Sequence, residues 1–263
     1  MPKKNNDIKI YTYQKILVIV LITIMIVFQF VDFHLFENAK DVTIVTNSII
    51  RFLGGAVFLI ILISFGYAKF FQFKNIGKSM LIIIPALIIS INNFPIIAFF
   101  DGRASLTEPS YRVYLFLIEC FSIGFFEEII FRGIILVILL KKLSQTKNGV
   151  FLSIVLSSAI FGLMHLVNLF NGASISDTLL QIGYSFLVGM MWAIMFLKIG
   201  NLWLIMLLHA TYNFFGQVMF YLGNVDGRYD IYTIGITTLF TVIVAGYSIM
   251  LFKQLEDKPL FSL

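Results

Sequence analysis

Long apolar runs separated by short polar loops dominate this chain from one end to the other. A helix that crosses the hydrocarbon core of a bilayer needs about 20 consecutive, mostly apolar residues. By that criterion the pattern predicts an all-α, polytopic transmembrane helix bundle of about eight spans. The expected spans are residues 16–35, 49–70, 79–100, 112–140, 149–170, 178–198, 201–221 and 231–252. Because no repeat, low-complexity segment or linker divides them, we expect a single transmembrane domain over residues 1–263.

Three of these spans depart from a uniform apolar helix. The first follows several lysines and resembles a signal peptide, but its apolar run exceeds the usual length of about 7–15 residues and no small-residue cleavage site follows, so we interpret it as a retained span. The third is interrupted by Asn92, Asn93 and Pro95, which predicts a kink or a polar lining for a cavity. The fourth is longer than one crossing requires, which indicates a tilted helix, a projecting end or an interfacial start.

Lysine and arginine are distributed unevenly among the loops, and this bias predicts the topology. Basic residues are concentrated in the N-terminal tail, the 70–78 and 141–148 loops, the turn at Lys198 and the C-terminal end. Few of them occur in the 37–48, 101–111, 170–177 and 222–230 loops. Because rich and poor loops alternate, both termini are expected to be cytoplasmic, as an even number of spans also requires.

Composition narrows the class of protein further. Hydrophobic residues make up 59% of the chain and charged residues 13%, with a mean hydropathy of +0.95. A soluble globular chain carries about 25% charged residues, so lipid must form much of the surroundings of this one. The net charge of +5 comes from loop lysines and arginines, which indicates the lipid bilayer and not nucleic acid as a partner. We expect an integral, multi-pass membrane protein.

Ionisable residues inside the spans carry the strongest functional signal. A charged group at mid-bilayer costs at least ~2.5–3.5 kcal/mol on insertion scales, so it needs a partner or a task. The fourth span contains Glu127, Glu128 and Arg132. Residues four apart share a helix face, so Glu128 and Arg132 are expected to pair, whereas Glu127 points about 100° away and has no counter-ion on its own helix. The alternative is a structural ion pair beside a protonated, inactive Glu127.

Two further spans each carry a histidine. Phe161 and His165 share a face of the fifth span, and His209 and Asn213 share a face of the seventh. Taken alone, His165 could be a satisfied interfacial group, and His209 with Asn213 could form hydrogen bonds between helices. The third histidine, His34, is expected at the membrane interface.

Taken together, these residues on three helices are what a site in the interior of a bundle requires. Glu119 of the fourth span is a weaker candidate that we expect nearer the outer surface. By depth alone, His165 lies nearer the outer face than Glu127 and His209 do. A tilted or broken helix would be needed to bring the three together.

Three motifs occur in order along the chain: EExxxR at residues 127–132, FxxxH at 161–165 and HxxxN at 209–213. This ordered set resembles the CPBP family, the CAAX proteases and bacteriocin-processing enzymes also called the Abi family. Its eukaryotic members are the type II CAAX prenyl endopeptidases. The resemblance covers about residues 125–215 and implies an intramembrane endopeptidase with an eight-helix core, with the catalytic part at about 112–221 here.

The resemblance implies a role for each motif residue. Glu127 and His165 would activate a water molecule, and His209 and Asn213 would stabilise the oxyanion. The chemistry of these residues agrees, since peptide hydrolysis needs a base for water and donors for the tetrahedral oxyanion.

The resemblance implies that Glu128 and Arg132 support the site. It leaves open whether the enzyme uses a metal. The family is often labelled as metalloproteases, and Glu127, His165 and His209 would form the His₂Glu set of a catalytic zinc site. The HExxH motif is absent, however, and a mechanism without metal uses the same residues. We favour no metal and no other cofactor, with zinc as the alternative.

The leading functional hypothesis is an endopeptidase acting on a peptide or protein substrate at or within the membrane. Leader-bearing peptides and pheromone or bacteriocin precursors are possible substrates in a bacterial host, and prenylated CAAX proteins only in a eukaryotic one. A second hypothesis is a non-enzymatic immunity or scaffold protein with the same fold. A third is a proton-coupled transporter, since buried glutamate and histidine also build proton relays.

Overall fold

The computed structural model describes residues 36–170, 172–226 and 231–255, together with the single positions 19, 20, 23 and 27. The first expected span, 16–35, therefore lies almost entirely outside the described residues, as does His34. The predicted number of spans and the predicted side of each terminus stay predictions for this reason.

Helices joined by short turns make up most of the described chain. The longer α-helices are α2 (Ala39–Leu62), α3 (Ile76–Asn92), α5 (Ser110–Glu128), α7 (Lys147–Met164), α8 (Ile175–Ile199), α9 (Leu202–Tyr221) and α10 (Ile231–Lys253). The shorter helical elements are η1, a π-helix (Ile63–Tyr67), η2, a 3₁₀-helix (Ala68–Phe71), α4 (Ile96–Phe100), η3, a π-helix (Ile129–Ile135), α6 (Leu136–Leu143) and η4, a 3₁₀-helix (His165–Leu169). Two short strands complete the set, β1 (Ala104–Leu106) and β2 (Gly223–Val225). The all-α bundle predicted from the apolar runs is confirmed.

The apolar runs fold as the pattern predicts. Within the described residues, five helical segments are long and apolar enough to cross a bilayer: Ala39–Phe71, Lys147–Leu169, Ile175–Ile199, Leu202–Tyr221 and Ile231–Lys253. The fourth predicted span, which carries several ionisable residues, forms one further helical run through α5, η3 and α6.

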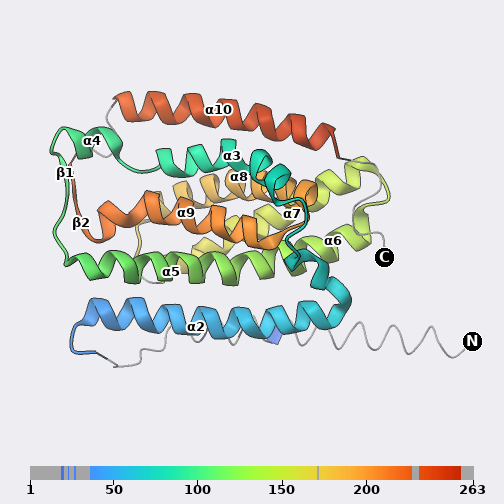
Figure 1. Ribbon diagram of the computed structural model, residues 1–263, viewed down its shortest axis with the longest axis horizontal. Coiled ribbons are helices and arrows are strands. Elements are labelled where there is room, and N and C mark those ends of the chain that lie inside the picture. Colours follow the sequence, from blue (N-terminus) through green and yellow to red (C-terminus); the bar gives the residue numbers. More distant parts are fainter. Residues whose placement is uncertain are drawn as a thin grey trace, which may run out of the picture.

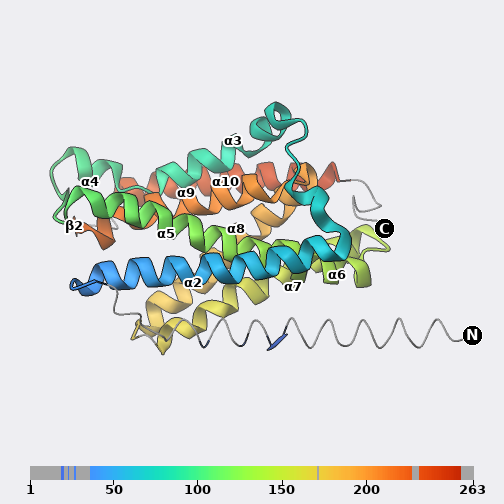
Figure 2. The same cartoon turned by 60° about the horizontal axis from the view of Figure 1, so that its bottom comes forward.

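The helices form a layered bundle (Figure 1). In order across it lie α10, α3, α9, α5 and α2, each packed against the next, with α10 at one edge and α2 at the other. The pair α7 and α8 packs on one face of this row, where α8 contacts α9 and α7 contacts η3 (Figure 2). The three helical runs that carry the predicted motifs, α5–η3, α7 and α9, therefore meet in the interior.

The third predicted span is broken, as its polar residues and proline indicate. α3 ends at Asn92 and α4 begins at Ile96. At the break, the side-chain amide of Asn93 donates to the Tyr212 carbonyl of α9 at 3.3 Å. A Cβ atom at Gly216 would lie 2.2 Å from that amide nitrogen, so glycine is required for this approach. The break thus docks α3 onto the helix that carries His209.

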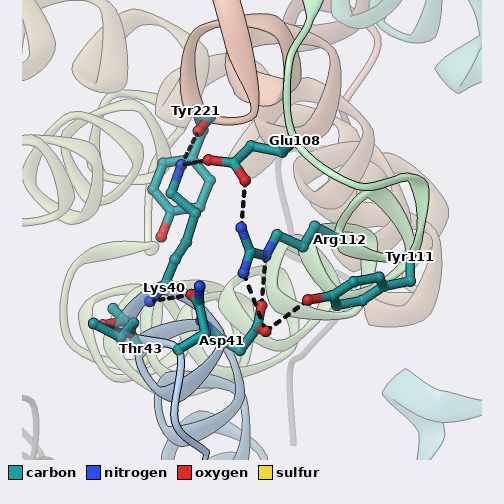
Figure 3. Close-up of polar contacts among 9 residues, drawn as sticks. Lys40, Asp41, Thr43, Glu108, Tyr111, Arg112 and Tyr221 are labelled. Atoms are coloured by element: carbon teal, nitrogen blue, oxygen red, sulfur yellow. Dashed lines mark hydrogen bonds and ion pairs between the residues drawn. The ribbon is translucent and has the colours of Figure 1, made fainter.

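Polar and charged side chains of α2, of α5 and of the loop before α5 meet at one end of the bundle (Figure 3). Arg112 of α5 donates from Nε and Nη2 to Asp41 of α2 at 2.7 and 3.2 Å, and the Tyr111 hydroxyl donates to the same carboxylate at 2.7 Å. Lys40 donates to Glu108 at 2.7 Å, and Glu108 also accepts from Arg112. We call these five residues the polar clasp. They hold the beginning of α2 against the beginning of α5.

The polar clasp stands beside the small sheet formed by β1 and β2. The strands pair antiparallel, with Ala104 opposite Val225, and Lys40 donates to the Tyr221 carbonyl at 3.0 Å. Hydrogen bonds from Lys40 and then from Arg112 hold the pKa of Glu108 below its usual range. The 101–111 and 222–226 loops, both predicted on the outer side, therefore lie together.

The opposite end of the bundle gathers the basic loops (Figure 1). The side-chain amide of Asn201 donates to the Gln72 carbonyl at 2.9 Å, and the Lys147 ammonium donates to the Lys253 carbonyl at 3.0 Å. Loops that the charge bias assigns to one side of the membrane therefore share one end of the fold. The charge bias assigns that side to the cytoplasm.

We expect Arg112→Ala to lower the melting temperature in detergent by several degrees. The substitution leaves Asp41 and Glu108 without their shared cation at a position where Arg112 is only 7% exposed. Arg103→Ala is the matched control, because Arg103 pairs with Asp101 on the surface, where the side chains are 35% and 42% exposed, and such pairs contribute only ~0–1 kcal/mol. Equal small shifts for both variants would contradict a structural role of the clasp.

Candidate functional site

The two adjacent glutamates stand where the helix changes its winding. α5 ends at Glu128, and the π-helix η3 begins at the next residue. The Phe131 carbonyl accepts from the backbone N–H of Leu136, five residues on, and also from the hydroxyl of Ser157 of α7 at 3.0 Å. Single π-helical turns inside α-helices occur frequently at functional sites. Here the hydrogen bond from Ser157 joins the π-turn to α7, the helix that leads directly into His165.

Glu128 and Arg132 form the ion pair that their spacing predicts. Arg132 Nη1 donates to Glu128 Oε1 at 2.8 Å, and the two side chains are 1% and 0% exposed. Arg132 Nη2 also donates to the Gly189 carbonyl of α8 at 3.3 Å. The pair is therefore fully removed from solvent and joins α5–η3 to α8.

His209 lies between the two glutamates, a placement that the sequence did not indicate. Its Nδ1 donates to Glu128 Oε1 at 2.7 Å. Its Nε2 lies 3.7 Å from Glu127 Oε2, too far for a direct hydrogen bond. Because a carboxylate accepts, Nδ1 carries a hydrogen, and Nε2 is turned toward Glu127. Glu128 and Glu127, which point in different directions from their helix, thus lie next to the two different nitrogens of one imidazole ring.

Glu127 differs from Glu128 in being partly accessible and incompletely bonded. Its side chain is 24% exposed, yet its Oε2 atom is buried and has no hydrogen-bond partner among the described residues. At 3.7 Å, Glu127 Oε2 and His209 Nε2 leave no room for an oxygen atom on the line between them. An oxygen atom to the side of that line can lie about 2.8 Å from each of them, within ordinary hydrogen-bond range.

His165 reaches the same region through the end of its helix. α7 ends at Met164, and His165 begins the 3₁₀-helix η4. The Phe161 ring lies 5.5 Å from the His165 ring and 5.9 Å from the His209 ring, between centroids. Counting along the spans placed His165 nearer the outer face than His209. In the structure the two histidines lie close enough for one phenyl ring to contact both.

Asn213 lies one helical turn beyond His209 on α9 and is half-buried. A rise of 1.5 Å per residue separates the two by about 6 Å along the helix axis. The neighbouring Tyr212 carbonyl receives the Asn93 amide, so this turn is fixed from the α3 side. Asn213 therefore stands beside His209 on a helix turn that is held in place.

Two close backbone approaches set the spacing of these helices. A Cβ atom at Gly124 would lie 2.7 Å from the Met206 carbonyl oxygen of α9 and 3.4 Å from the His209 Cβ. A Cβ atom at Gly189 would lie 3.1 Å from the Phe161 ring and 3.3 Å from Arg132 Nη2. Glycine at these positions lets α5 approach α9 and lets α8 approach Arg132, which brings the polar groups within reach of each other.

Aromatic rings enclose the buried polar groups. The Arg132 guanidinium carbon lies 4.5 Å from the Phe161 ring centroid and 5.4 Å from that of Trp192. The Trp192 ring also lies 4.4 Å from the His209 ring at 35°. Phe161, which the motif contains without an assigned role, therefore contacts Arg132 and both histidines. Trp192 lies outside all three motifs, and its sequence position in an apolar helix is typical of ordinary core.

The alternative zinc site expected from the sequence would use Glu127, His165 and His209. Glu127 Oε2 and His209 Nε2 face each other at 3.7 Å, close to the separation of two ligands on one zinc ion. Among the described residues, however, no group of three His, Cys, Asp or Glu side chains is placed to hold a metal. The third expected ligand, His165, does not complete the set, so the residues as placed do not fit a three-ligand zinc site.

Glu119 lies within the bundle and has a partner of its own. It is 7% exposed and pairs with Arg51 of α2 at 3.1 Å. It lies two helical turns toward the polar clasp from Glu127 on α5. This pairing gives Glu119 a structural task between α2 and α5, away from the histidines.

One family model matches the part of the chain that carries the site. Residues 109–215 match the family described as Rce1-like, type II CAAX prenyl endopeptidase Rce1-like. The matched segment runs from the residue before α5 into α9 and contains all three motifs. No curated protein and no solved structure matches the chain.

Proposed function

We propose that the protein is an intramembrane endopeptidase of the CPBP family in which Glu127 and His165 activate the hydrolytic water, since residues 109–215 match the Rce1-like type II CAAX prenyl endopeptidases. Five long apolar helices and the family match support an integral, multi-pass membrane protein. One observation carries the proposal: the unbonded Oε2 of Glu127 faces Nε2 of His209 across 3.7 Å.

In the proposed reaction, a base and an oxyanion donor both face the reacting carbonyl. Glu127 takes a proton from a water molecule that His165 helps to orient, and the resulting hydroxide attacks the peptide carbonyl carbon. His209, in its protonated form, and Asn213 donate to the oxyanion that forms on the carbonyl oxygen. The carbon–nitrogen bond then breaks, and Glu127 returns the proton to the leaving amine.

Glu128 and Arg132 support this chemistry through His209. A carboxylate that accepts from one imidazole nitrogen fixes the ring orientation and stabilises the imidazolium, as in other hydrolytic enzymes. The 2.7 Å contact from Nδ1 gives Glu128 this role, and Arg132 balances its charge from the other side. The second glutamate of the motif thus acts on the imidazole and not directly on substrate.

We propose that the reaction uses no metal and no other cofactor. A base, an oriented imidazole and an amide donor are together sufficient for peptide hydrolysis. The substrate class is a peptide or protein held at the membrane. For a bacterial cell membrane these are leader-bearing or precursor peptides, and for a eukaryotic host they are prenylated proteins.

Cleavage of membrane-anchored peptides by the purified protein in liposomes tests the function. In water enriched in ¹⁸O, mass spectrometry should find the label in the new carboxyl group, and strong chelation should leave the rate within about twofold. Loss of activity on chelation, restored by zinc, would overturn the metal-free mechanism. Proton-driven transport without cleavage would overturn the protease assignment in favour of a carrier, and the absence of both would favour an immunity or scaffold role.

A further inference from the structure

Helix α8 contains none of the three motifs, yet one of its side chains lies at the centre of the site. Trp192 is 1% exposed, in a stretch from Met191 to Leu197 that is buried throughout. Its ring centroid lies 4.4 Å from that of His209, with 35° between the ring planes. The same ring lies 5.4 Å from the guanidinium carbon of Arg132. One side chain therefore contacts both groups that bond to Glu128.

Arg132 packs against two aromatic rings that also lie close to each other. Phe161 lies on it at 4.5 Å and Trp192 at 5.4 Å, and the two rings lie 6.4 Å from each other. The Gly189 carbonyl, one turn before Trp192 on α8, accepts from Arg132 at 3.3 Å. A cation over an aromatic face gains more when it is desolvated, as this one is. Helix α8 thus holds the arginine by a hydrogen bond and by a ring face.

The indole nitrogen of Trp192 does not explain why a tryptophan is buried at this position. A buried indole nitrogen usually finds an acceptor, but Nε1 of Trp192 is buried without a hydrogen-bond partner among the described residues. An unsatisfied buried donor costs free energy. The contribution of this side chain therefore comes from its ring, which contacts His209 and Arg132 and also lies against Tyr212 and Phe161.

We propose that Trp192 is a positioning residue for hydrolysis, and this rests on the proposed function. Glu128 fixes Nδ1 of His209 at 2.7 Å, and the Phe161 ring meets the imidazole nearly at right angles. The Trp192 ring lies over the imidazole at 4.4 Å and 35° and restricts the tilting of its plane. The imidazole then keeps Nε2 directed at the space in front of Glu127.

Trp192→Leu and Trp192→Met remove the aromatic face, and Trp192→Phe keeps one while deleting the unbonded nitrogen. A displacement of about 1 Å at a reacting group can cost about a hundredfold in rate. We therefore expect kcat to fall about a hundredfold in the leucine and methionine variants, with KM within about twofold. The phenylalanine variant should recover most of the rate. A methionine variant as active as the phenylalanine one would overturn the proposal.

The other tryptophan of the chain supplies the control. Trp203 stacks on Phe125 and meets Phe71 edge-on, apart from the ion pair. Trp203→Leu should therefore change stability without a selective fall in kcat.

A second measurement needs no substrate. The melting shifts of Trp192→Leu, His209→Ala and the double variant form a cycle, in which contacting residues give a combined shift smaller than the sum. The cycle of Trp203→Leu with His209→Ala should be additive. Additive shifts for Trp192 would refute its role at His209. A wild-type protein that cleaves nothing would refute the proposed function and leave this cycle unaffected.

Discussion

Glu127→Gln will abolish peptide hydrolysis while the protein accumulates normally in the membrane. The amide keeps the size and shape of the carboxylate but cannot take a proton from water. Loss of a general base typically lowers the rate by about 10²–10⁴-fold. The side chain is 24% exposed, and its Oε2 has no hydrogen-bond partner among the described residues, so folding depends little on its charge. The rate of peptide cleavage and the amount of protein in purified membranes measure the two effects separately.

Glu37→Gln is the matched control, since it makes the same chemical change at an exposed position before α2. It should leave both the cleavage rate and the membrane level unchanged. Cleavage at the wild-type rate by Glu127→Gln would exclude Glu127 as the base. If the variant is inactive but intact, it should retain bound substrate, and cross-linking in the membrane followed by mass spectrometry would then identify that substrate.

The spans could be predicted from the sequence because lipid imposes one simple rule on every crossing segment. The break at Asn93 and the pairing of Glu128 with Arg132 also followed from local rules. The beginning of α2 could not be predicted in this way. The helix begins at residue 39 and not at the expected residue 49, because the ten residues between are polar or mixed in character. Asp41 is tolerated there since Arg112, 71 residues away, neutralises it. Partners so distant along the chain leave no signal in a local pattern.

The same limit applies to the site. Motif order indicated which helices carry the polar residues, but not that His209 would lie between two glutamates, one of them 81 residues away. From the sequence, Trp192 is indistinguishable from an ordinary core residue, because its neighbours on α8 are apolar too. Gly124 gave no signal, since only the neighbouring helix reveals what a Cβ atom would strike. Each of these features depends on packing between helices, which periodicity does not encode.

Arg132→Ala will destabilise the protein by about 3–5 kcal/mol, the usual cost of removing one partner from a buried ion pair. Glu128 is 0% exposed and would keep only His209 as a partner for its shared oxygen. The change also removes a cation that packs against two aromatic rings, and the donor to Gly189. We expect a lower melting temperature and a lower amount of protein in the membrane. Lys142→Ala, at an exposed position on α6, should change neither.

A double variant separates two causes of the lower stability of Arg132→Ala: the uncompensated charge of Glu128 and the loss of a large side chain. In the double variant Arg132→Met with Glu128→Gln, neither charge remains, so no carboxylate is left buried without its cation. This pair should be more stable than Arg132→Ala, although it has lost both original groups. It should nevertheless hydrolyse peptides slowly, because the neutral amide no longer stabilises a protonated His209. A double variant as unstable as Arg132→Ala would show that packing, and not the uncompensated charge, accounts for the effect.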